Sequence, residues 1–391
     1  MRLGHFVLCF VLATSLLISG CNSGDTMPSN ELEKLIIDVF DPLPGETVLF
    51  MIDEPHGDLA DYDLWGSRRQ MAEEWRMTFE QLGSKMGFSV LPMLTYPATG
   101  NHNGPLPDLG ETNGKQVRLD ETFRASNIVV AMTEFSATAP LMEYSQQIPN
   151  LRVASMPTVH QGMLETALAA DYQEVARKCQ ILGDKLDHAE GAKLMFSTGE
   201  QVYLDLRNRK AKIDDGQLHA DKGGERVINL PSGEAYIAPY EGELPGQTSL
   251  TEGVIPMSFE GVVVQLRISE NQVLEVVSDD QVADQLREWF AVDAARKNLA
   301  ELGLGCNDKA VVTGNILEDE KVFGVHLAYG RSDHTGGVFG VDDFSDPANV
   351  VHQDVLYPFG GEIEVTNLTF EYADGTSEEI IQNGAYTVFS N

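Results

Sequence analysis

Residues 301–337 read ELGLGCNDKAVVTGNILEDEKVFGVHLAYGRSDHTGG, and residues 348–357 read ANVVHQDVLY. The apolar runs LAELGLG, VFGVHLAYG and NVVHQDVLY in and beside these stretches are typical of buried strands. Side chains able to bind a metal ion lie in or next to each run: Glu301, Glu320, His326, His352 and Asp354. Since burying an unpaired charge is costly, these groups need partners. A divalent metal ion would be a partner common to all of them.

The pair His352 and Asp354 is the most specific indication of a metal site in this pattern. An i, i+2 spacing on a strand points both side chains to the same face of the sheet. His326 would project from a second strand. Imidazole and carboxylate together bind zinc, cobalt, manganese or iron. For either histidine considered alone, the alternative is that it lies in the core and that hydrogen bonds within the protein satisfy its ring nitrogens.

The length and composition of the chain limit the classes of protein to which it can belong. The chain has 391 residues, which is enough for roughly two domains of ordinary size. Its 60 acidic and 27 basic residues give a formal charge of −33. Such a surface repels nucleic-acid phosphates and anionic membranes, so neither is expected as a partner. The charge itself is typical of a surface adapted for solubility.

The N-terminal residues predict where the protein is located. Residues 1–21 read MRLGHFVLCFVLATSLLISGC, a basic head and an apolar run that predict a secretory leader. The ending ISGC resembles a bacterial lipobox, which makes Cys21 the predicted lipidation site, and residues 22–30 form a polar tether. We therefore expect a lipid-anchored protein of the bacterial cell envelope that touches the membrane only through its anchor. An ordinary cleaved leader is the alternative.

Two further cysteines, Cys179 and Cys306, are too few for a disulfide framework. Each is expected to be a buried thiol. A bridge between the two is the less favoured alternative.

The rest of the chain divides into two domains. Over residues 31–187, the apolar runs TVLFMI, FSVLPML and NIVVAM alternate with helical patterns, which predicts an α/β domain with a mainly parallel sheet. Residues 188–391 are strand-rich and predict a β-rich α+β domain that binds the metal. One helix is expected there, over residues 281–302. No glycine-rich phosphate motif follows the first strand, so no nucleotide site is predicted.

A further glutamate, Glu234, begins the strand-like part of NLPSGEAYIAP, residues 229–239. On its own it could be an exposed turn residue. Together with the five residues above it completes four carboxylates and two imidazoles. That set suits two divalent ions about 3.5–4 Å apart with a shared carboxylate and a bridging water.

In these motifs the chain resembles the aminopeptidase T group of thermophilic metallo-aminopeptidases. The resemblance runs from about residue 171 to 357 and rests on ADYQEVARK, DDG at 214–216, NLPSGEAYIAP, AELGLGCN, GNILEDEKVFGVHLAYG and VVHQDV. It implies an α/β domain, a β-rich domain with two metal ions (zinc, cobalt or manganese), a homodimer, and a peptide or small amide as substrate. The implied ligands are Glu234, Glu301, Glu320, His326, His352 and Asp354, with Glu301 and Asp354 as bridges.

One departure from the family concerns proton transfer. Members often carry a tyrosine about seven residues beyond the first ligand histidine, where this chain has Asp333 followed by His334. His334 is therefore a candidate proton donor or extra ligand, and a plain loop histidine is the alternative. Glu301 is the other residue expected to be essential for catalysis.

Two other functions fit parts of the pattern. Two histidines and one aspartate also form a mononuclear iron triad, and ring-cleaving 2,5-dihydroxypyridine dioxygenases look related to the same family. Under that hypothesis His326, His352 and Asp354 hold iron(II), and Glu234 and Glu301 do not bind the metal. A surface-anchored binding protein without activity is the third possibility. The complete set of glutamates favours the hydrolase.

Overall fold

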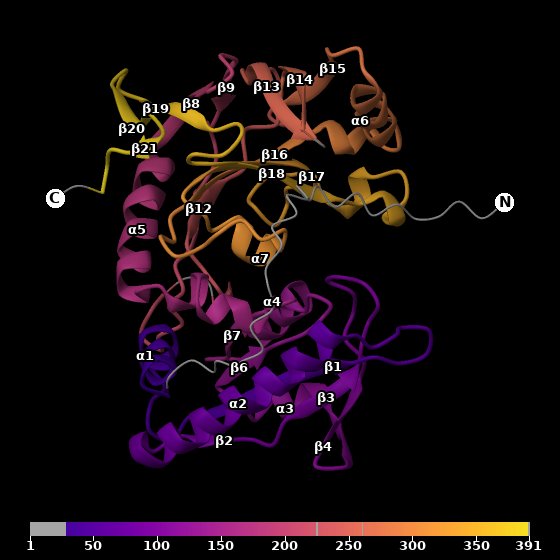
Figure 1. Ribbon diagram of the computed structural model, residues 1–391, viewed down its shortest axis with the longest axis vertical. Coiled ribbons are helices and arrows are strands. Elements are labelled where there is room, and N and C mark those ends of the chain that lie inside the picture. Colours follow the sequence, from indigo (N-terminus) through magenta and orange to yellow (C-terminus); the bar gives the residue numbers. More distant parts are fainter. Residues whose placement is uncertain (1–28, 224–225, 260, 390–391) are drawn as a thin grey trace.

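The computed structural model describes residues 29–223, 226–259 and 261–389. The predicted leader, Cys21 and all but the last two residues of the predicted tether lie outside these ranges. Figure 1 shows two regions, an N-terminal one in indigo and purple and a C-terminal one in magenta to yellow. Among the described helices, none has the length and apolar character that a membrane crossing requires.

The N-terminal region is built on the predicted mainly parallel sheet. Its strands run in the order β11-β7-β6-β1-β3-β4-β5, and the short β2 pairs with β1. All pairs are parallel except those of the edge hairpin β4–β5 and its contact with β3. In chain order the strands are β1 (Thr47–Glu54), β2 (Ser89–Val90), β3 (Leu94–Pro97), β4 (Leu109–Thr112), β5 (Lys115–Arg118), β6 (Ile128–Ala131), β7 (Arg152–Ser155) and β11 (Val227–Asn229).

Helices cover the two faces of this sheet, and apolar side chains fill the space between them. The central strand β1 has six successive buried residues, as expected for a strand covered on both sides. The helix α2 ends where Gly87 takes φ 88°, a left-handed conformation that suits glycine. The helices of this region are α1 (Ser29–Phe40), α2 (Asp63–Met86), α3 (Leu119–Arg124) and α4 (Thr138–Gln147).

The C-terminal region contains two antiparallel sheets, which confirms the predicted strand-rich part. The larger has the order β15-β14-β13-β9-β8-β19-β20-β21, and the smaller has the order β10-β12-β16-β17-β18. Strands of the larger sheet are β8 (Ala189–Phe196), β9 (Gln201–Asp205), β13 (Glu252–Phe259), β14 (Val262–Ser269), β15 (Gln272–Val276), β19 (Val365–Tyr372), β20 (Ser377–Gln382) and β21 (Ala385–Tyr386). Strands of the smaller sheet are β10 (Lys212–Asp214), β12 (Glu234–Ile237), β16 (Leu299–Gly305), β17 (Gly324–Gly330) and β18 (His352–Pro358).

In the described part of the chain, the α-helices that accompany these sheets are α5 (Tyr172–His188), α6 (Gln281–Ala291) and α7 (Ile316–Asp319). The helix predicted over residues 281–302 is too long, because α6 ends at Ala291 and residues 299–305 form β16. The side chain of Asp293 accepts hydrogen bonds from Ala295 and Ser345, which fixes a short turn between helix and strand. A distant loop therefore decides where this helix ends.

The two regions interlock along the chain. The strand β11 belongs to the second half of the sequence but pairs with β7 of the first sheet. Conversely, α5 packs its buried face, including Val175 and Leu182, into the core of the C-terminal sheets. The side chain of Asn315, which caps α7, exchanges hydrogen bonds with Thr158 just beyond the first sheet. The predicted boundary at residue 187 falls at the end of α5.

Candidate metal centre

The register of the smaller sheet collects the predicted ligands on one face. Glu301 on β16 is opposite Ala328 on β17, and Ala328 is opposite Asp354 on β18. One step along, Gly303 is opposite His326. Because side chains two residues apart on a strand share a face, the ligands of three adjacent strands project to the same side. Glu234 joins them from β12, opposite Gly305.

Small residues alternate with the ligands on this face. Gly303 and Gly305 follow Glu301 at two-residue steps, and Ala328 and Gly330 follow His326 in the same way. A Cβ added to Gly303 would lie 1.9 Å from Nε2 of His326. The long acidic and imidazole side chains therefore occupy space that the glycines leave open.

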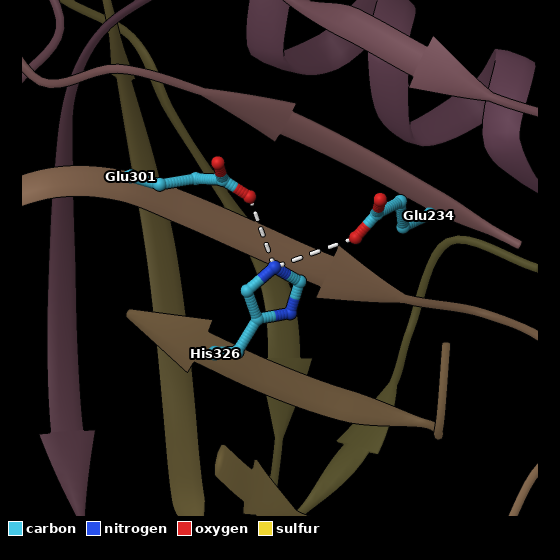
Figure 2. A group of neighbouring side chains, drawn as sticks. All are labelled: Glu234, Glu301 and His326. Atoms are coloured by element: carbon cyan, nitrogen blue, oxygen red, sulfur yellow. Dashed lines mark hydrogen bonds and ion pairs between the residues drawn. The ribbon is translucent and has the colours of Figure 1, made fainter. Parts of the chain in front are cut away.

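Two groups of ligand atoms result, and they share one residue. Glu234, Glu301 and His326 offer atoms that all lie within 4.8 Å of one another, and so do Glu301, His352 and Asp354. In the first group, Nε2 of His326 lies 3.0 Å from Oε1 of Glu301 and 3.4 Å from Oε2 of Glu234 (Figure 2). In the second, Nε2 of His352 lies 3.5 Å from Oε2 of Glu301 and 3.6 Å from Oδ1 of Asp354. Glu301 thus has one carboxylate oxygen directed to each group.

The donor set fits divalent metal ions. The atoms Oε2 of Glu234 and Oδ1 of Asp354 are buried, and neither has a hydrogen-bond partner among the described residues. A buried carboxylate oxygen without a partner is costly, and a cation supplies the missing partner. His352 donates from Nδ1 to the carbonyl oxygen of Arg331 at 2.7 Å, which leaves Nε2 to face the site. Such an outer hydrogen bond is the usual way to orient a metal-binding imidazole.

Glu320 lies beside a buried lysine. Glu320 follows α7, and its carboxylate is 2.8 Å from Nζ of Lys321. The same fully buried ammonium is 2.6 Å from Glu234 and 3.1 Å from Asp214. Within the described part of the chain, Glu320 belongs to neither of the two ligand groups. Lys321 therefore holds one oxygen of Glu234 and leaves the other directed at His326.

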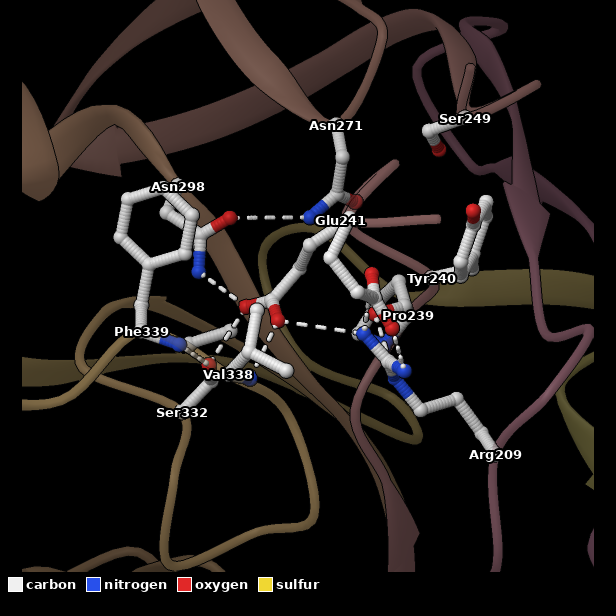
Figure 3. A network of polar contacts seen from close by, with 12 residues as sticks. Arg209, Pro239, Tyr240, Glu241, Ser249, Asn271, Asn298, Ser332, Val338 and Phe339 are labelled. Carbon is white, nitrogen blue, oxygen red and sulfur yellow. Dashed lines mark hydrogen bonds and ion pairs between the residues drawn. The ribbon is translucent and has the colours of Figure 1, made fainter. Parts of the chain in front are cut away.

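A loop that is held in place by hydrogen bonds positions His334 at the edge of the site. The ring of His334 packs edge-on against the ring of His352, with 4.5 Å between centroids. The buried carboxylate of Glu241 holds this loop at both ends, because it accepts hydrogen bonds from Ser332 Oγ at 2.5 Å and Val338 N at 2.6 Å (Figure 3). Arg209 and Asn298 also donate to the carboxylate of Glu241.

Proximity of these groups shifts their pKa values in the metal-free protein. Burial alone would lower the pKa of His326, but the hydrogen bond to Glu301 and the nearby carboxylates raise this pKa to about 9. Burial would raise the pKa of Glu301, yet the hydrogen bonds from His326 and His352 keep it well below its usual range. Burial raises the pKa of Glu234 to about 7 against the opposing charge of Lys321. Without metal the site therefore retains protons.

A pH dependence of metal stabilisation follows from the raised pKa of His326. A group whose pKa rises on folding, here from 6.5 to about 9, contributes stability that is complete below pH 6.5 and is lost as the pH passes 9. Metal binding requires the neutral imidazole, so protons compete less as the pH rises. We expect the Tm difference between metal-loaded and chelator-treated protein to grow from pH 6.5 to pH 9 in calorimetric scans. A difference that shrinks over this interval would argue against His326 as a ligand.

The contact of Gly303 with His326 gives a second prediction. Gly303→Ala places a methyl group on the imidazole, so the ring must leave its position. We expect metal affinity to fall by at least about 10-fold, the lower range for disturbing a group that orients a ligand, as measured by calorimetric titration with Zn²⁺. Gly66→Ala is the control, since the nearest atom to its added Cβ is 3.7 Å away. Equal affinities for the two variants would contradict the packing described above.

The structure places most of the predicted site residues in one cluster. The structure brings Glu234, Glu301, His326, His352 and Asp354 together and places Glu320 next to them through Lys321. His334 lies at the rim, and its side chain is 41% exposed. Sequence reasoning missed Lys321, Asp214 and Gly303. The repeated spacing E-x-G-x-G at 301–305 and H-x-A-x-G at 326–330 was a signal that small residues share the ligand face.

Comparisons with known proteins agree with this geometry. The model of a family described as thermophilic metalloprotease (M29) matches residues 140–349. No curated protein matches the sequence.

Two of the solved structures that match cover most of the chain and share its fold. One is the 2,5-dihydroxypyridine dioxygenase from Pseudomonas putida KT2440, with a TM-score of 0.59 and 14% identity over 92% of this chain and 96% of the other. The other is wild-type AmpT from Thermus thermophilus, with a TM-score of 0.55 and 15% identity over 92% of this chain and 98% of the other. At these identities the likeness extends to the fold alone.

Proposed function

The chain belongs to the thermophilic metalloprotease family M29, and from this membership we propose that it is a metallo-aminopeptidase that releases N-terminal amino acids from peptides. The family prediction made from the sequence is thereby confirmed, and the chain is a hydrolase of the metal-dependent class. The observation that carries the proposal is the pair of ligand groups joined by Glu301. One carboxylate shared between two groups of ligands suits a site for two ions.

In this proposal Glu234, Glu301 and His326 hold one divalent ion, and Glu301, His352 and Asp354 hold the other. When bound, two such ions polarise the scissile carbonyl and lower the pKa of the attacking water. The protein fixes the ligands on adjacent strands, and Lys321 prevents Glu234 from turning away. The acidic surroundings favour a substrate with a free, positively charged amine, which restricts cleavage to the N-terminal residue.

A dioxygenase is the alternative to be tested, because one protein of the same fold has that activity. An iron triad would require His326, His352 and Asp354 to converge on one position. In the described residues, His326 is instead grouped with Glu234 and Glu301. The arrangement of ligand atoms therefore favours the hydrolase.

Metal analysis of the purified full chain, followed by turnover assays, separates the two functions. About two ions per chain by mass spectrometry, together with release of an N-terminal amino acid from aminoacyl p-nitroanilides, is the expected result. One iron per chain with oxygen-dependent cleavage of 2,5-dihydroxypyridine would establish the alternative. Protein that binds metal but turns over neither substrate class would contradict both activities.

His334 is the proposed proton carrier. Its ring packs against that of His352 at the rim of the site, and the loop that carries it is fixed by Glu241. We expect His334→Ala to lower kcat about 100-fold, a typical loss for a general acid or base, while the metal content is unchanged. His188→Ala, at an exposed helix end, serves as control. Unaltered kcat in His334→Ala would assign the proton transfer to another group.

Location and assembly are further parts of the proposal. The lipobox-like sequence at residues 18–21 supports anchoring of the mature chain through a lipid on Cys21 at the cell envelope. The resemblance to the aminopeptidase T group supports a homodimer.

A further inference from the structure

Two buried thiols that are far apart in the sequence touch in the core of the C-terminal region. Cys179 lies on α5, and Cys306 directly follows β16, the strand that carries Glu301. Their sulfur atoms are 3.2 Å apart across 127 residues of chain, and both residues are fully buried. This separation is shorter than an ordinary van der Waals contact of two sulfur atoms.

Both cysteines sit on backbone that holds them in place. The amide of Cys306 donates to the carbonyl oxygen of Gly233 at 2.7 Å, so it continues the pairing of β16 with the segment before β12. The thiol of Cys179 is 3.5 Å from the carbonyl oxygen of Asp214 at the end of β10. Since a disulfide has a sulfur separation of about 2 Å, closing the pair requires the two sulfur atoms to approach by about 1 Å.

We propose that Cys179 and Cys306 form a disulfide bond that ties α5 to the end of the strand bearing Glu301. The thiolate of one cysteine attacks a disulfide oxidant such as oxidised glutathione, forms a mixed disulfide and releases one glutathione thiolate. The second cysteine thiolate then attacks the protein sulfur of that mixed disulfide and releases the other glutathione. Two cysteine thiols are oxidised, one glutathione disulfide is reduced, and the two protons pass to the glutathione thiols.

The burial of the two cysteines and the compartment in which the chain folds determine when the bond forms. Burial raises the pKa of the Cys179 thiol well above its ordinary value, so exchange in the closed protein is slow. The bond is therefore made while the chain folds or when the region opens. A protein exported by the proposed leader would fold in an oxidising compartment, where such bonds persist. Closure of a long loop makes the bond a large constraint on the unfolded chain.

Peptide mapping of the full chain tests the bond itself. The purified protein is incubated with oxidised glutathione in urea below the unfolding transition, then denatured in iodoacetamide and digested without reductant. A linked pair of peptides containing Cys179 and Cys306, lost on treatment with dithiothreitol, is the expected result. Recovery of both cysteines as alkylated thiols, or in glutathione adducts only, would overturn the proposal.

Thermal unfolding supplies an independent measurement. The oxidised wild-type protein should have a Tm higher than the reduced protein by about 5 °C or more, as expected for closing a loop of this length in a chain of this size. Cys306→Ala, given the same oxidant, should show no such shift, which separates the bond from other effects of oxidation, including those at Cys9 and Cys21 of the leader. Equal Tm values for oxidised and reduced wild-type protein would also overturn the proposal. Neither measurement depends on the proposed catalytic activity.

Discussion

Glu301→Gln is expected to abolish peptidase activity and to leave a folded protein. Glu301 is the residue common to both ligand groups, and each of its oxygens faces one of them. Glutamine occupies nearly the same volume but carries no charge and directs one NH₂ group into the site. Since loss of an outer partner of a ligand already costs 10–100-fold, we expect kcat/KM to fall by more than about 100-fold.

Metal content and circular dichroism distinguish this effect from unfolding. The variant should bind fewer than the wild-type number of ions while it retains the wild-type spectrum. Glu318→Gln is a matched control, because Glu318 is also a buried glutamate, its Oε1 accepts hydrogen bonds from the backbone amides of Ala167 and Val311, and within the described residues it belongs to neither ligand group. Wild-type turnover and metal content in Glu301→Gln would remove the basis for a shared ligand.

Lys321→Met is expected to destabilise the metal-free protein by about 3–5 kcal/mol, the usual cost of removing one partner of a buried ion pair. The ammonium of Lys321 is fully buried among Asp214, Glu234 and Glu320. Methionine has a similar length and no charge, so three carboxylates lose their common partner. Part of this loss should be recovered by protonation at low pH, since burial already raises the pKa of Asp214 to about 7.

Urea unfolding of chelator-treated protein measures this loss. Lys178→Met is the matched control, because Lys178 is also largely buried but its carboxylate partners, Glu174 and Asp308, lie 3.9 and 3.7 Å away. The control should lose at most about 1 kcal/mol, as is typical of weak ion pairs. Similar unfolding midpoints for the two variants would mean that the cluster around Lys321 is not a special source of stability.

Much of the fold was predictable because the local signals agreed with one another. The apolar run TVLFMI predicts β1, and alternation with helices predicts the parallel sheet. His352 and Asp354 share a face because of their spacing alone. In these cases residues close in the sequence carry the information, and tertiary contacts only reinforce it.

The remaining features depend on contacts between distant segments. The end of α6 is fixed by Asp293, whose partner Ser345 lies 52 residues away. The strand β11 joins the first sheet although its neighbours in sequence belong to the second region. Lys321 appears in the sequence as one basic residue next to an apolar run, and only the fold shows that it meets Asp214 and Glu234. The hydrophobic periodicity within a single segment does not indicate such contacts between distant residues.

The placement of the proposed ligands on β12, β16, β17 and β18 has a consequence for the exchange of metal ions. Neighbouring strands are held about 4.8 Å apart by their backbone hydrogen bonds, so the spacing of the ligands is set by the sheet and not by the ion. Removing the ions should leave the ligand positions nearly unchanged, and reloading should be fast and fully reversible. Ions whose radius does not match the preformed site would then bind less tightly, because the ligand positions cannot follow the ion.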